Sequence, residues 1–344
     1  MSTNNNEFLL FNPPEENPGF DMNDWFTIPA GEPVMEYLVD KFWDQPGPPE
    51  KWEAARLSKA VFLYREITSS WTILVKFYAA KVSSAESAVR YSDNEFQCTQ
   101  QALSFRWEDG TFGAPRALGA TNGTIFLEYI DGLTLEDTIS IRRNRPGTIR
   151  PALKKVATLL AGIHSQNLHD EFPRNFHYEI SDIQKIVEQL AGKGVLKDNP
   201  IVVDGLQKLI TRWEVDPVMV DYIPTTIHGD STTSNFIFPW NGGLIAIDWE
   251  RMYTADPASE LGRLLAEIAN GIYQYGGNYD EADQLVTFTQ DAYCQALPHD
   301  WNTQALTHRT KFYQASSTLR IARNGWLPRL QRTMLVSQAL AILA

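Results

Sequence analysis

The sequence predicts an α+β protein in which a small sheet-rich lobe precedes a larger helical lobe. Two hairpin patterns lie before residue 130, and apolar residues recur at helical spacing after Gly132. The chain has 344 residues, enough for two lobes with a ligand cleft between them. We expect an N-terminal extension over residues 1–55, a small lobe over residues 56–130 and a helical lobe over residues 131–344.

Composition is typical of a soluble globular protein, because hydrophobic residues make up 43% of the chain and charged residues 21%. No apolar run approaches the ~20 residues of a membrane helix. The first basic residue is Lys41, so the positively charged start of a secretory signal is missing. Two cysteines in a chain of this size indicate a reducing compartment. We expect a cytoplasmic protein.

The acidic charge lies mainly in the extension. Residues 1–55 hold 11 acidic and two basic residues, which accounts for most of the net charge of -12. The sequence has no cluster of basic residues that could neutralise nucleic-acid phosphates. We therefore expect neither nucleic acid nor a membrane as a partner. The sequence does not indicate an oligomeric state.

The extension also contains apolar residues, including Phe8–Phe11 and a helical pattern around Val34–Trp43. This is too much apolar surface for a solvated tail, so we expect the extension to pack on the small lobe. Its charge then either attracts a cationic ligand or only keeps the surface soluble.

Two hairpins are predicted in the small lobe. Thr68–Ser70 separates two strand-like runs, Ala60–Ile67 and Trp71–Tyr78. Asn122-Gly123 is typical of a type I′ hairpin turn, because both residues tolerate positive φ.

A helix is expected within residues 84–105, between the two hairpins. Its start is ambiguous because two Ser-x-x-Glu capping patterns are present, Ser83 with Glu86 and Ser92 with Glu95.

Helical periodicity continues through the second lobe. Helices are predicted over Pro151–Leu168, Ile183–Leu190, Leu261–Ile272, Leu285–Leu297 and Ser317–Leu343.

The segment Ile227–Ile268 places polar residues beside apolar strand patterns. If Asn241 and Gly242 are the centre of a hairpin turn, the numbers of paired residues add up to 483. Asn235 and Asp248 meet this condition, which would place their Cβ atoms about 5 Å apart. A four-residue loop keeps this register, and a three-residue loop breaks it. Such a pair of oxygen donors suits magnesium, which completes its shell with water and phosphate.

Asp230 lies five residues before Asn235, on the loop that leads into the same hairpin. A carboxylate there can take the proton of an attacking hydroxyl group. Phosphoryl transfer needs little more than positioning, charge neutralisation and this proton acceptor.

These motifs together resemble the aminoglycoside phosphotransferase and choline kinase-like family of small-molecule kinases. The resemblance rests on His228-Gly229-Asp230 followed by Asn235, on Ile247–Glu250, and on Asp256-Pro257. Softer matches are Phe126–Gly132, similar to the family's interlobe hinge, and Leu159–His164, similar to a family helix. The resemblance covers residues 56 to about 268.

The resemblance implies a protein kinase-like fold that uses ATP and magnesium. It implies that Asp230 is the catalytic base and that Asn235 and Asp248 bind magnesium. The acceptor would be the hydroxyl group of a small molecule such as an aminoglycoside, an amino alcohol or a sugar. Only eight positions separate Asp248 from Asp256, which leaves no room for the activation segment of a protein kinase.

In the small lobe the resemblance implies a nucleotide site. Lys76, a charged residue within an alternating strand pattern, would contact the phosphates and pair with Glu95 or, alternatively, Glu86. Ser58, Glu128 and Ile130 are the further candidates for nucleotide binding.

Four features bear on the alternative interpretations. Leu57–Phe62, the expected nucleotide loop, has no glycine, so a catalytically degenerate nucleotide-binding scaffold is the competing interpretation. His164 and His228 are expected to be buried hydrogen-bonding residues. Glu250 and Asp256 are expected to tie the loop after Asp248 to the next helix. Several aromatic residues either line a pocket or belong to the core: Trp249, Tyr253, Tyr273, Tyr275 and Tyr279.

Overall fold

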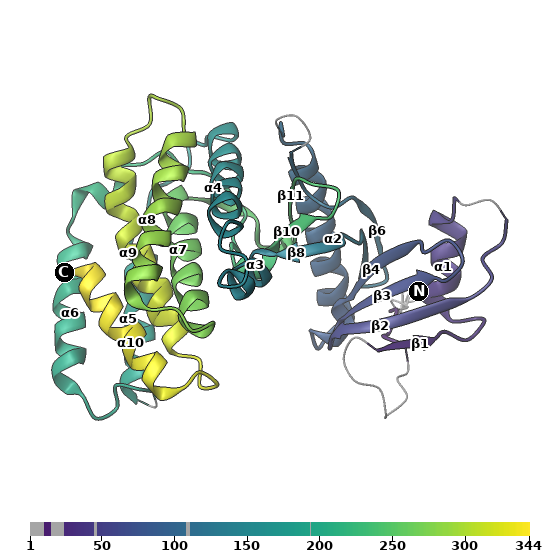
Figure 1. The fold of residues 1–344 in the computed structure, drawn as a ribbon, viewed down its shortest axis with the longest axis horizontal. Helices are drawn as coiled ribbons and strands as arrows, with labels where there is room; N and C mark the ends of the chain where they lie inside the picture. Colours follow the sequence, from purple (N-terminus) through teal and green to yellow (C-terminus); the bar gives the residue numbers. More distant parts are fainter. Residues whose placement is uncertain (1–9, 15–23, 45–46, 108–110, 193) are drawn as a thin grey trace, which may run out of the picture. The chain divides into compact units, whose positions relative to one another are not determined.

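The computed structural model describes residues 10–14, 24–44, 47–107, 111–192 and 194–344 (Figure 1). The chain divides into two compact units whose segments interleave along the sequence. A sheet unit contains residues up to Phe105, Gly113–Asp131 and Ile245–Arg251. A helical unit contains Arg106–Phe112, Gly132–Leu244 and Met252–Ala344. The secondary structure is α+β, as the sequence predicts.

The sheet unit is built on a six-stranded antiparallel sheet with the strand order β1-β2-β3-β4-β7-β6. The strands are β1 (Trp25–Thr27), β2 (Trp52–Ser58), β3 (Val61–Glu66), β4 (Thr72–Phe77), β6 (Ala117–Thr121) and β7 (Thr124–Glu128). Both predicted hairpins are confirmed. β3 pairs with β4, and Asn122 and Gly123 join β6 to β7 with φ values of 52° and 69°.

The predicted helix of the extension is confirmed as α1 (Pro33–Phe42). Glu32 caps it, because its carboxylate accepts a 2.6 Å hydrogen bond from the backbone N–H of Met35. Val34 and Leu38 lie buried in one cluster with sheet residues such as Trp52. Burying several such side chains stabilises the contact by roughly 1.5–3 kcal/mol each. Phe8 and Leu9 lie outside the described residues.

The helix expected within residues 84–105 is α2 (Ala85–Leu103). Neither predicted cap is correct. The cap is Ser84, whose hydroxyl accepts a hydrogen bond from the backbone N–H of Ser87. Ser92 lies inside the helix and donates to the carbonyl of Val89. A capping pattern identifies a helix start only where the serine has extended backbone, and Ser84 does.

The helical unit contains eight α-helices within the described residues. They are α3 (Leu135–Ile141), α4 (Ile149–Gln166), α5 (His177–Gly192), α6 (Pro200–Glu214), α7 (Pro257–Gln274), α8 (Tyr279–Ala296), α9 (Thr303–Ala322) and α10 (Arg329–Leu343). α7 has the most enclosed position, since most of its side chains are buried and it packs on α8 and α9.

All five predicted helical segments contain helix, and the last one spans parts of two helices. Ser317–Leu343 is divided between α9 and α10 by a break that includes Gly325 and Pro328. Two further helices, α3 and α6, were not predicted.

Short strands lie on either side of the segments 228–235 and 247–252. β8 (Gly132–Thr134) pairs with β10 (Phe236–Pro239), and β9 (Thr225–Ile227) pairs with β12 (Tyr253–Ala255), both antiparallel. The remaining strands are β5 (Phe112–Gly113) and β11 (Leu244–Ala246). Single 3-10 turns lie at Tyr78–Ala80, Pro217–Val220, Thr233–Asn235 and Trp249–Arg251.

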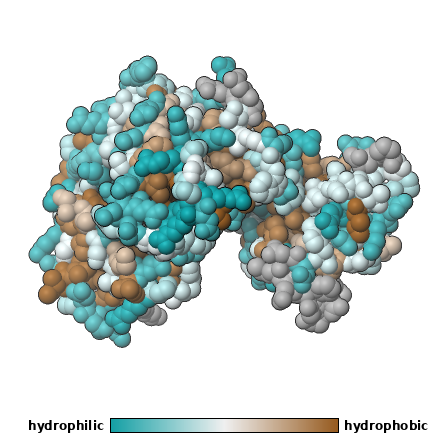
Figure 2. All heavy atoms as spheres, viewed as in Figure 1, coloured by the Kyte–Doolittle hydropathy of each residue, from teal (hydrophilic) through white to brown (hydrophobic). Residues whose placement is uncertain are grey.

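The described surface carries mixed polar and apolar residues. In Figure 2 hydrophilic residues cover much of the visible face, and hydrophobic residues gather only in small groups. Among the helices that the structure describes, none combines the length and apolar character needed to cross a bilayer.

Candidate active site

Three charged residues from distant parts of the sequence meet in the sheet unit. Lys76 on β4 donates from Nζ to Glu95 Oε1 on α2 at 2.5 Å and to Asp248 Oδ1 at 2.7 Å. The Lys76 and Glu95 side chains are almost fully buried. The predicted Lys76–Glu95 pair is thus present, whereas the alternative partner Glu86 is exposed in the first turn of α2.

Burial alone would lower the pKa of Lys76, because it disfavours the charged ammonium group. The negative charges of Glu95 and Asp248 outweigh burial and raise the pKa of Lys76 above its ordinary value. The lysine therefore remains positively charged at neutral pH and is held by two carboxylates.

Asp248 has an unusual backbone conformation, with a φ of 68°. Non-glycine residues rarely adopt this left-handed region, although aspartate tolerates it better than most. The following turn, Trp249–Arg251, packs against α2 and is anchored by two hydrogen bonds. Trp249 Nε1 donates to the carbonyl of Ala246 at 2.8 Å, and Asn94 Nδ2 donates to the carbonyl of Glu250 at 3.0 Å. These contacts hold the Asp248 carboxylate toward Lys76.

Tyr78 extends the cluster and was not singled out in the sequence. Its hydroxyl lies 2.6 Å from Glu95 Oε2 and 2.6 Å from Glu250 Oε2. A phenol carries one proton, so it can donate to only one of these carboxylates. The other short contact requires a proton on a glutamate. Burial, followed by the neighbouring charge of Asp248, raises the pKa of Glu95 despite the opposing effect of Lys76. The only sequence signal for Tyr78 is its position two residues after Lys76.

The carboxylates of this cluster fit a hard cation. Ligand oxygens of Glu95, Asp248 and Glu250 all lie within 4.8 Å of one another. Magnesium prefers such oxygens and usually takes only one or two from the protein. Lys81 Nζ also approaches Glu250, at 3.4 Å.

Asn235, the other predicted metal ligand, belongs to the helical unit, so its pairing with Asp248 stays a prediction. The loop between β10 and β11 has four residues, Trp240–Gly243, and its turn is closed by a hydrogen bond from the Gly242 N–H to the Pro239 carbonyl. This is the loop length that preserves the predicted register.

A second arrangement, in the helical unit, fixes the loop His228–Asp230. Glu260 on α7 accepts hydrogen bonds from the backbone N–H groups of His228 at 2.9 Å and Gly229 at 2.8 Å. Gly229 has a φ of 83°, which glycine adopts without strain. The two N–H groups therefore converge on one carboxylate.

Two histidines complete this arrangement. His164 Nε2 lies 2.8 Å from Glu260, and its Nδ1 lies 2.6 Å from the Tyr293 hydroxyl. His228 Nδ1 accepts a hydrogen bond from the backbone N–H of Asp230 at 3.2 Å. Both histidines are fully buried, which confirms that they are hydrogen-bonding residues of the core.

Glu260 is buried and stays ionised. Burial raises its pKa, but the hydrogen bonds from the His164 side chain and from the backbone N–H of His228 outweigh burial, so the pKa of Glu260 is lowered. Glu260 was not predicted from the sequence. It could have been identified there as an acidic residue at a buried position of the α7 pattern, four residues after Asp256.

Asp230 is held by two neighbours in the same unit. Asn235 Nδ2 donates to its backbone carbonyl at 2.8 Å, and Arg263 Nη2 donates to its Oδ1. Arg263 also donates from Nη1 to the carbonyl of Gly229 at 3.1 Å. The Asp230 side chain keeps an exposed fraction of 13%. The Asp230 carboxylate is therefore held in one orientation, and part of it remains accessible to a bound molecule. Arg263 was not predicted from the sequence.

The structural role expected for Asp256 is confirmed. It caps α7 by accepting from the Ala258 N–H at 3.0 Å, and Arg309 donates to it at 2.8 Å. The described contacts of the Glu250 side chain differ from the expected ones, because they are with Tyr78 and Lys81 in the sheet unit.

The remaining predicted residues have other contacts. Ser58 Oγ accepts a hydrogen bond from the Ala60 N–H at 3.4 Å, within the tight turn between β2 and β3. Glu128 accepts from the backbone N–H of Arg116 at 3.1 Å. Ile130 is half-buried just after β7. Their roles with a nucleotide stay predictions.

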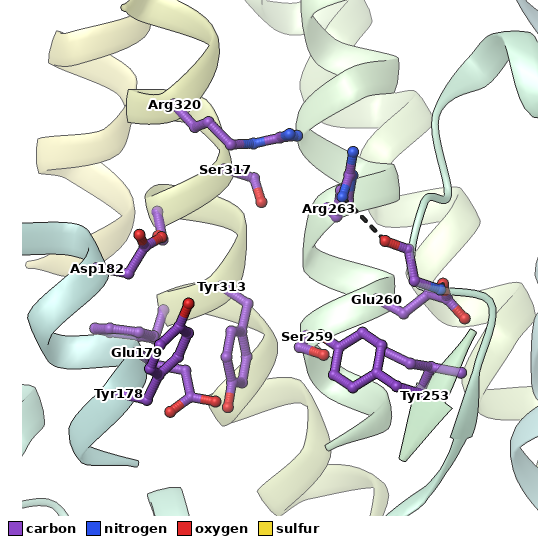
Figure 3. A pocket seen from close by; sticks show the side chains of 14 residues that line it. Tyr178, Glu179, Asp182, Tyr253, Ser259, Glu260, Arg263, Tyr313, Ser317 and Arg320 are labelled. Carbon is purple, nitrogen blue, oxygen red and sulfur yellow. Dashed lines mark hydrogen bonds between the residues drawn. The ribbon is translucent and has the colours of Figure 1, made fainter. Parts of the chain in front are cut away.

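A pocket of about 260 Å³ lies beside the His228–Asp230 loop in the helical unit (Figure 3). Gly229, Glu260 and Arg263 line it, together with Tyr178, Glu179 and Tyr313. Of the predicted aromatic candidates, Tyr253 lines this pocket and Trp249 is buried in the sheet unit.

Comparisons with known proteins bear on the family and the fold of the chain. The sequence matches the model of the phosphotransferase enzyme family over residues 108–294. A search of curated proteins finds no match.

Several solved structures share the fold. The streptomycin–ATP–APH(2'')-IIa ternary complex has a TM-score of 0.55 and 13% identity, covering 91% of this chain and 97% of that chain. The ADP-bound aminoglycoside phosphotransferase APH(2'')-Ib has a TM-score of 0.54 and 14% identity, covering 90% and 96%. An ethanolamine kinase from Plasmodium vivax has a TM-score of 0.50 and 13% identity, covering 82% and 78%. The expected protein kinase-like fold is confirmed.

Proposed function

Because the chain belongs to the phosphotransferase enzyme family, we propose that it moves the γ-phosphoryl group of ATP to a hydroxyl group of a small molecule in a magnesium-dependent reaction. The acceptor is an aminoglycoside, an amino alcohol or a sugar-like alcohol. The presence of only two cysteines in a chain of 344 residues supports a cytoplasmic location.

The observation that carries this proposal is the three-way contact of Lys76 with Glu95 and Asp248. A lysine held between two carboxylates is positioned to contact phosphate oxygens once a cation occupies the acidic side. The nucleotide then lies against Lys76, with Ser58, Glu128 and Ile130 as further contacts. This assignment matches the role that the resemblance implies for each residue.

Magnesium would be held by Asp248 and Asn235, and the Glu95 and Glu250 carboxylates contribute to the negative field around it. When bound, magnesium neutralises the charge that develops on the transferring phosphoryl group.

Asp230 acts as the catalytic base. Its Oδ1 is held by Arg263 and its backbone carbonyl by Asn235, so its orientation is set before the acceptor binds. Glu260 holds the two preceding N–H groups and thereby the loop. The hydroxyl proton of the acceptor moves to Asp230 as the oxygen attacks phosphorus.

The second candidate function is a nucleotide-binding scaffold without turnover. The observation that favours it is the turn between β2 and β3, where Ser58 and Lys59 stand in place of glycine. Glycine would allow the backbone to approach phosphates more closely. The presence of Asp230, Asn235 and Asp248 counts against a scaffold.

One experiment separates the two. We would measure ATP binding by calorimetry and ADP release in a coupled assay, each with and without magnesium, on the wild type and Asp230→Asn. An enzyme binds ATP in both proteins but loses turnover in Asp230→Asn. A scaffold binds ATP and shows the same negligible ADP release in both.

A further inference from the structure

The pocket beside Asp230 has charged groups of opposite sign at its two ends (Figure 3). In Figure 3 Arg263 and Arg320 lie toward one end, and Glu179 and Tyr178 lie toward the other. All of them belong to the helical unit, on α5, α7 and α9. Its volume of about 260 Å³ is below the ~300–1,000 Å³ typical of drug-sized ligands. The pocket is therefore suited to a small molecule.

At the basic end, Arg263 carries more N–H donors than its contacts within the described residues use. A guanidinium group carries five N–H donors. Arg263 uses Nη1 for the Gly229 carbonyl and Nη2 for Asp230, while its Nε is buried without a hydrogen-bond partner among the described residues. Buried polar atoms are nearly always paired, so this N–H is the kind of group that a ligand satisfies.

Arg320 adds a second positive charge at this end. It donates to Glu267 Oε1 at 3.1 Å, and Ser317 lies one turn before it on α9. Burial and then the positive charge of Arg263 lower the pKa of Arg320. An anionic group placed beside both guanidinium groups would relieve this repulsion.

The acidic end has an unpaired acceptor. Glu179 Oε2 is buried and has no hydrogen-bond partner among the residues that the structure describes. Burial, together with the charges of Asp256 and Asp182, raises the pKa of Glu179. Tyr178, Tyr253 and Tyr313 line the same pocket, and aromatic rings attract cations over their faces. An ammonium group is the ligand chemistry that this end accommodates.

We propose that the acceptor is a small alcohol carrying both an ammonium group, bound beside Glu179 and the tyrosines, and an anionic group, bound beside Arg263 and Arg320. This proposal rests on the proposed phosphotransferase function. The anionic group is a carboxylate or a phosphate, since both match a guanidinium group.

The test uses the full chain and compares small alcohols that carry different charged groups. L-homoserine and L-serine carry an ammonium and a carboxylate, and glycerophosphoethanolamine carries an ammonium and a phosphodiester. 3-Aminopropanol lacks the anion, and 4-hydroxybutyrate lacks the ammonium. Dissociation constants come from calorimetry, and ADP release with ATP and magnesium gives kcat/KM.

We expect one of the doubly charged probes to bind at least about tenfold more tightly than either singly charged probe. Tighter binding of the carboxylate probes would identify the anion as a carboxylate, and tighter binding of glycerophosphoethanolamine would identify it as a phosphate. Equal or tighter binding of 3-aminopropanol would overturn the proposal, and so would failure of every doubly charged probe to bind.

Two variants separate the ends of the pocket. Glu179→Gln should weaken binding of the doubly charged probe and of 3-aminopropanol, but not of 4-hydroxybutyrate. Arg320→Gln should weaken binding of the doubly charged probe and of 4-hydroxybutyrate, but not of 3-aminopropanol. Glu188→Gln and Arg329→Gln change exposed residues away from the pocket and are the matched controls.

Binding and phosphorylation of the probes test the pocket assignment and the phosphotransferase function separately. If the doubly charged probe binds with this charge selectivity but no probe is phosphorylated, the pocket assignment stands and the phosphotransferase function fails. If probes are phosphorylated and neither Glu179→Gln nor Arg320→Gln changes the selectivity, the pocket assignment fails and the function stands.

Discussion

The Lys76 cluster of the sheet unit and the Asp230 loop of the helical unit hold their carboxylates in different ways. In the cluster, side chains from β4, from α2 and from Asp248, two residues after β11, hold one another through charge. In the loop, backbone N–H groups of adjacent residues converge on Glu260. The cluster therefore depends on its charge balance, whereas the loop is preorganised by its backbone.

The largest expected effect is in the cluster. Asp248→Ala should abolish magnesium-dependent ATP binding, because it removes one predicted metal ligand and one of the two carboxylates that hold Lys76. Calorimetric titration of ATP with and without magnesium measures this loss. Retention of a magnesium-dependent affinity close to that of the wild type would show that Asp248 is not a ligand.

In the loop, Asp230→Asn should lower kcat by roughly 10²–10⁴ with ATP binding nearly unchanged. The change removes proton acceptance but hardly alters shape. Kinetic assays with an alcohol that the wild type phosphorylates measure the loss of kcat. The control is Asp204→Asn, which changes an exposed residue on α6. A variant that keeps most of its turnover would leave Asp230 without this role.

The buried carboxylate behind the loop should matter for stability. Glu260→Gln replaces an acceptor with an amide that cannot serve both N–H groups and His164, and each buried hydrogen bond to a charged group contributes about 1.5–3 kcal/mol. We expect the free energy of unfolding to fall by about 2–4 kcal/mol, as measured by urea denaturation. Glu188→Gln is the control. A loss no larger than in the control would mean that Glu260 does not support the loop.

The same substitution has a pH signature. The folded-state pKa of Glu260 lies below its ordinary value of 4.5, so its stabilising effect is complete above that pH and is lost as the pH falls through the folded pKa. The stability difference between the wild type and Glu260→Gln should therefore shrink as the pH falls below 4.5. Denaturation series at several acidic pH values measure this, and a difference independent of pH would contradict it.

The smallest effect is expected at the edge of the cluster. Tyr78→Phe removes a hydroxyl that contacts both Glu95 and Glu250, so stability should fall by about 1–3 kcal/mol while kcat changes less than tenfold. Tyr91→Phe, whose ring stacks on Tyr78 at a more exposed position, is the control. Equal thermal stability of the two variants would show that the Tyr78 hydroxyl does not contribute to stability.

Sequence reasoning recovered the parts of the molecule that are local. The Asn122-Gly123 turn, the strand that carries Lys76 and the α7 periodicity are visible in short windows. The pairing of Lys76 with Glu95 was implied by the family resemblance, with Glu86 as the alternative. α6 was missed although Asn199 and Pro200 form a standard helix start, because its segment carries no functional motif.

The missed site residues are nonlocal. Tyr78, Glu260 and Arg263 act through partners many residues away, and each looks like an ordinary strand-end or helix residue in its own window. Glu179 and Arg320 converge on one pocket only because α5 and α9 lie side by side, which no pattern within either helix indicates.

The most direct test of phosphoryl transfer by this protein is to look for the phosphorylated product. Wild type, Asp230→Asn and Asp248→Ala would each be incubated with ATP, magnesium and the alcohols named above, and the products analysed by mass spectrometry. We predict an acceptor heavier by one phosphoryl group with the wild type, and little or none with either variant. Equal product from the wild type and Asp230→Asn, or ATP binding by the wild type with no phosphorylated alcohol in a broad screen, would contradict the claim.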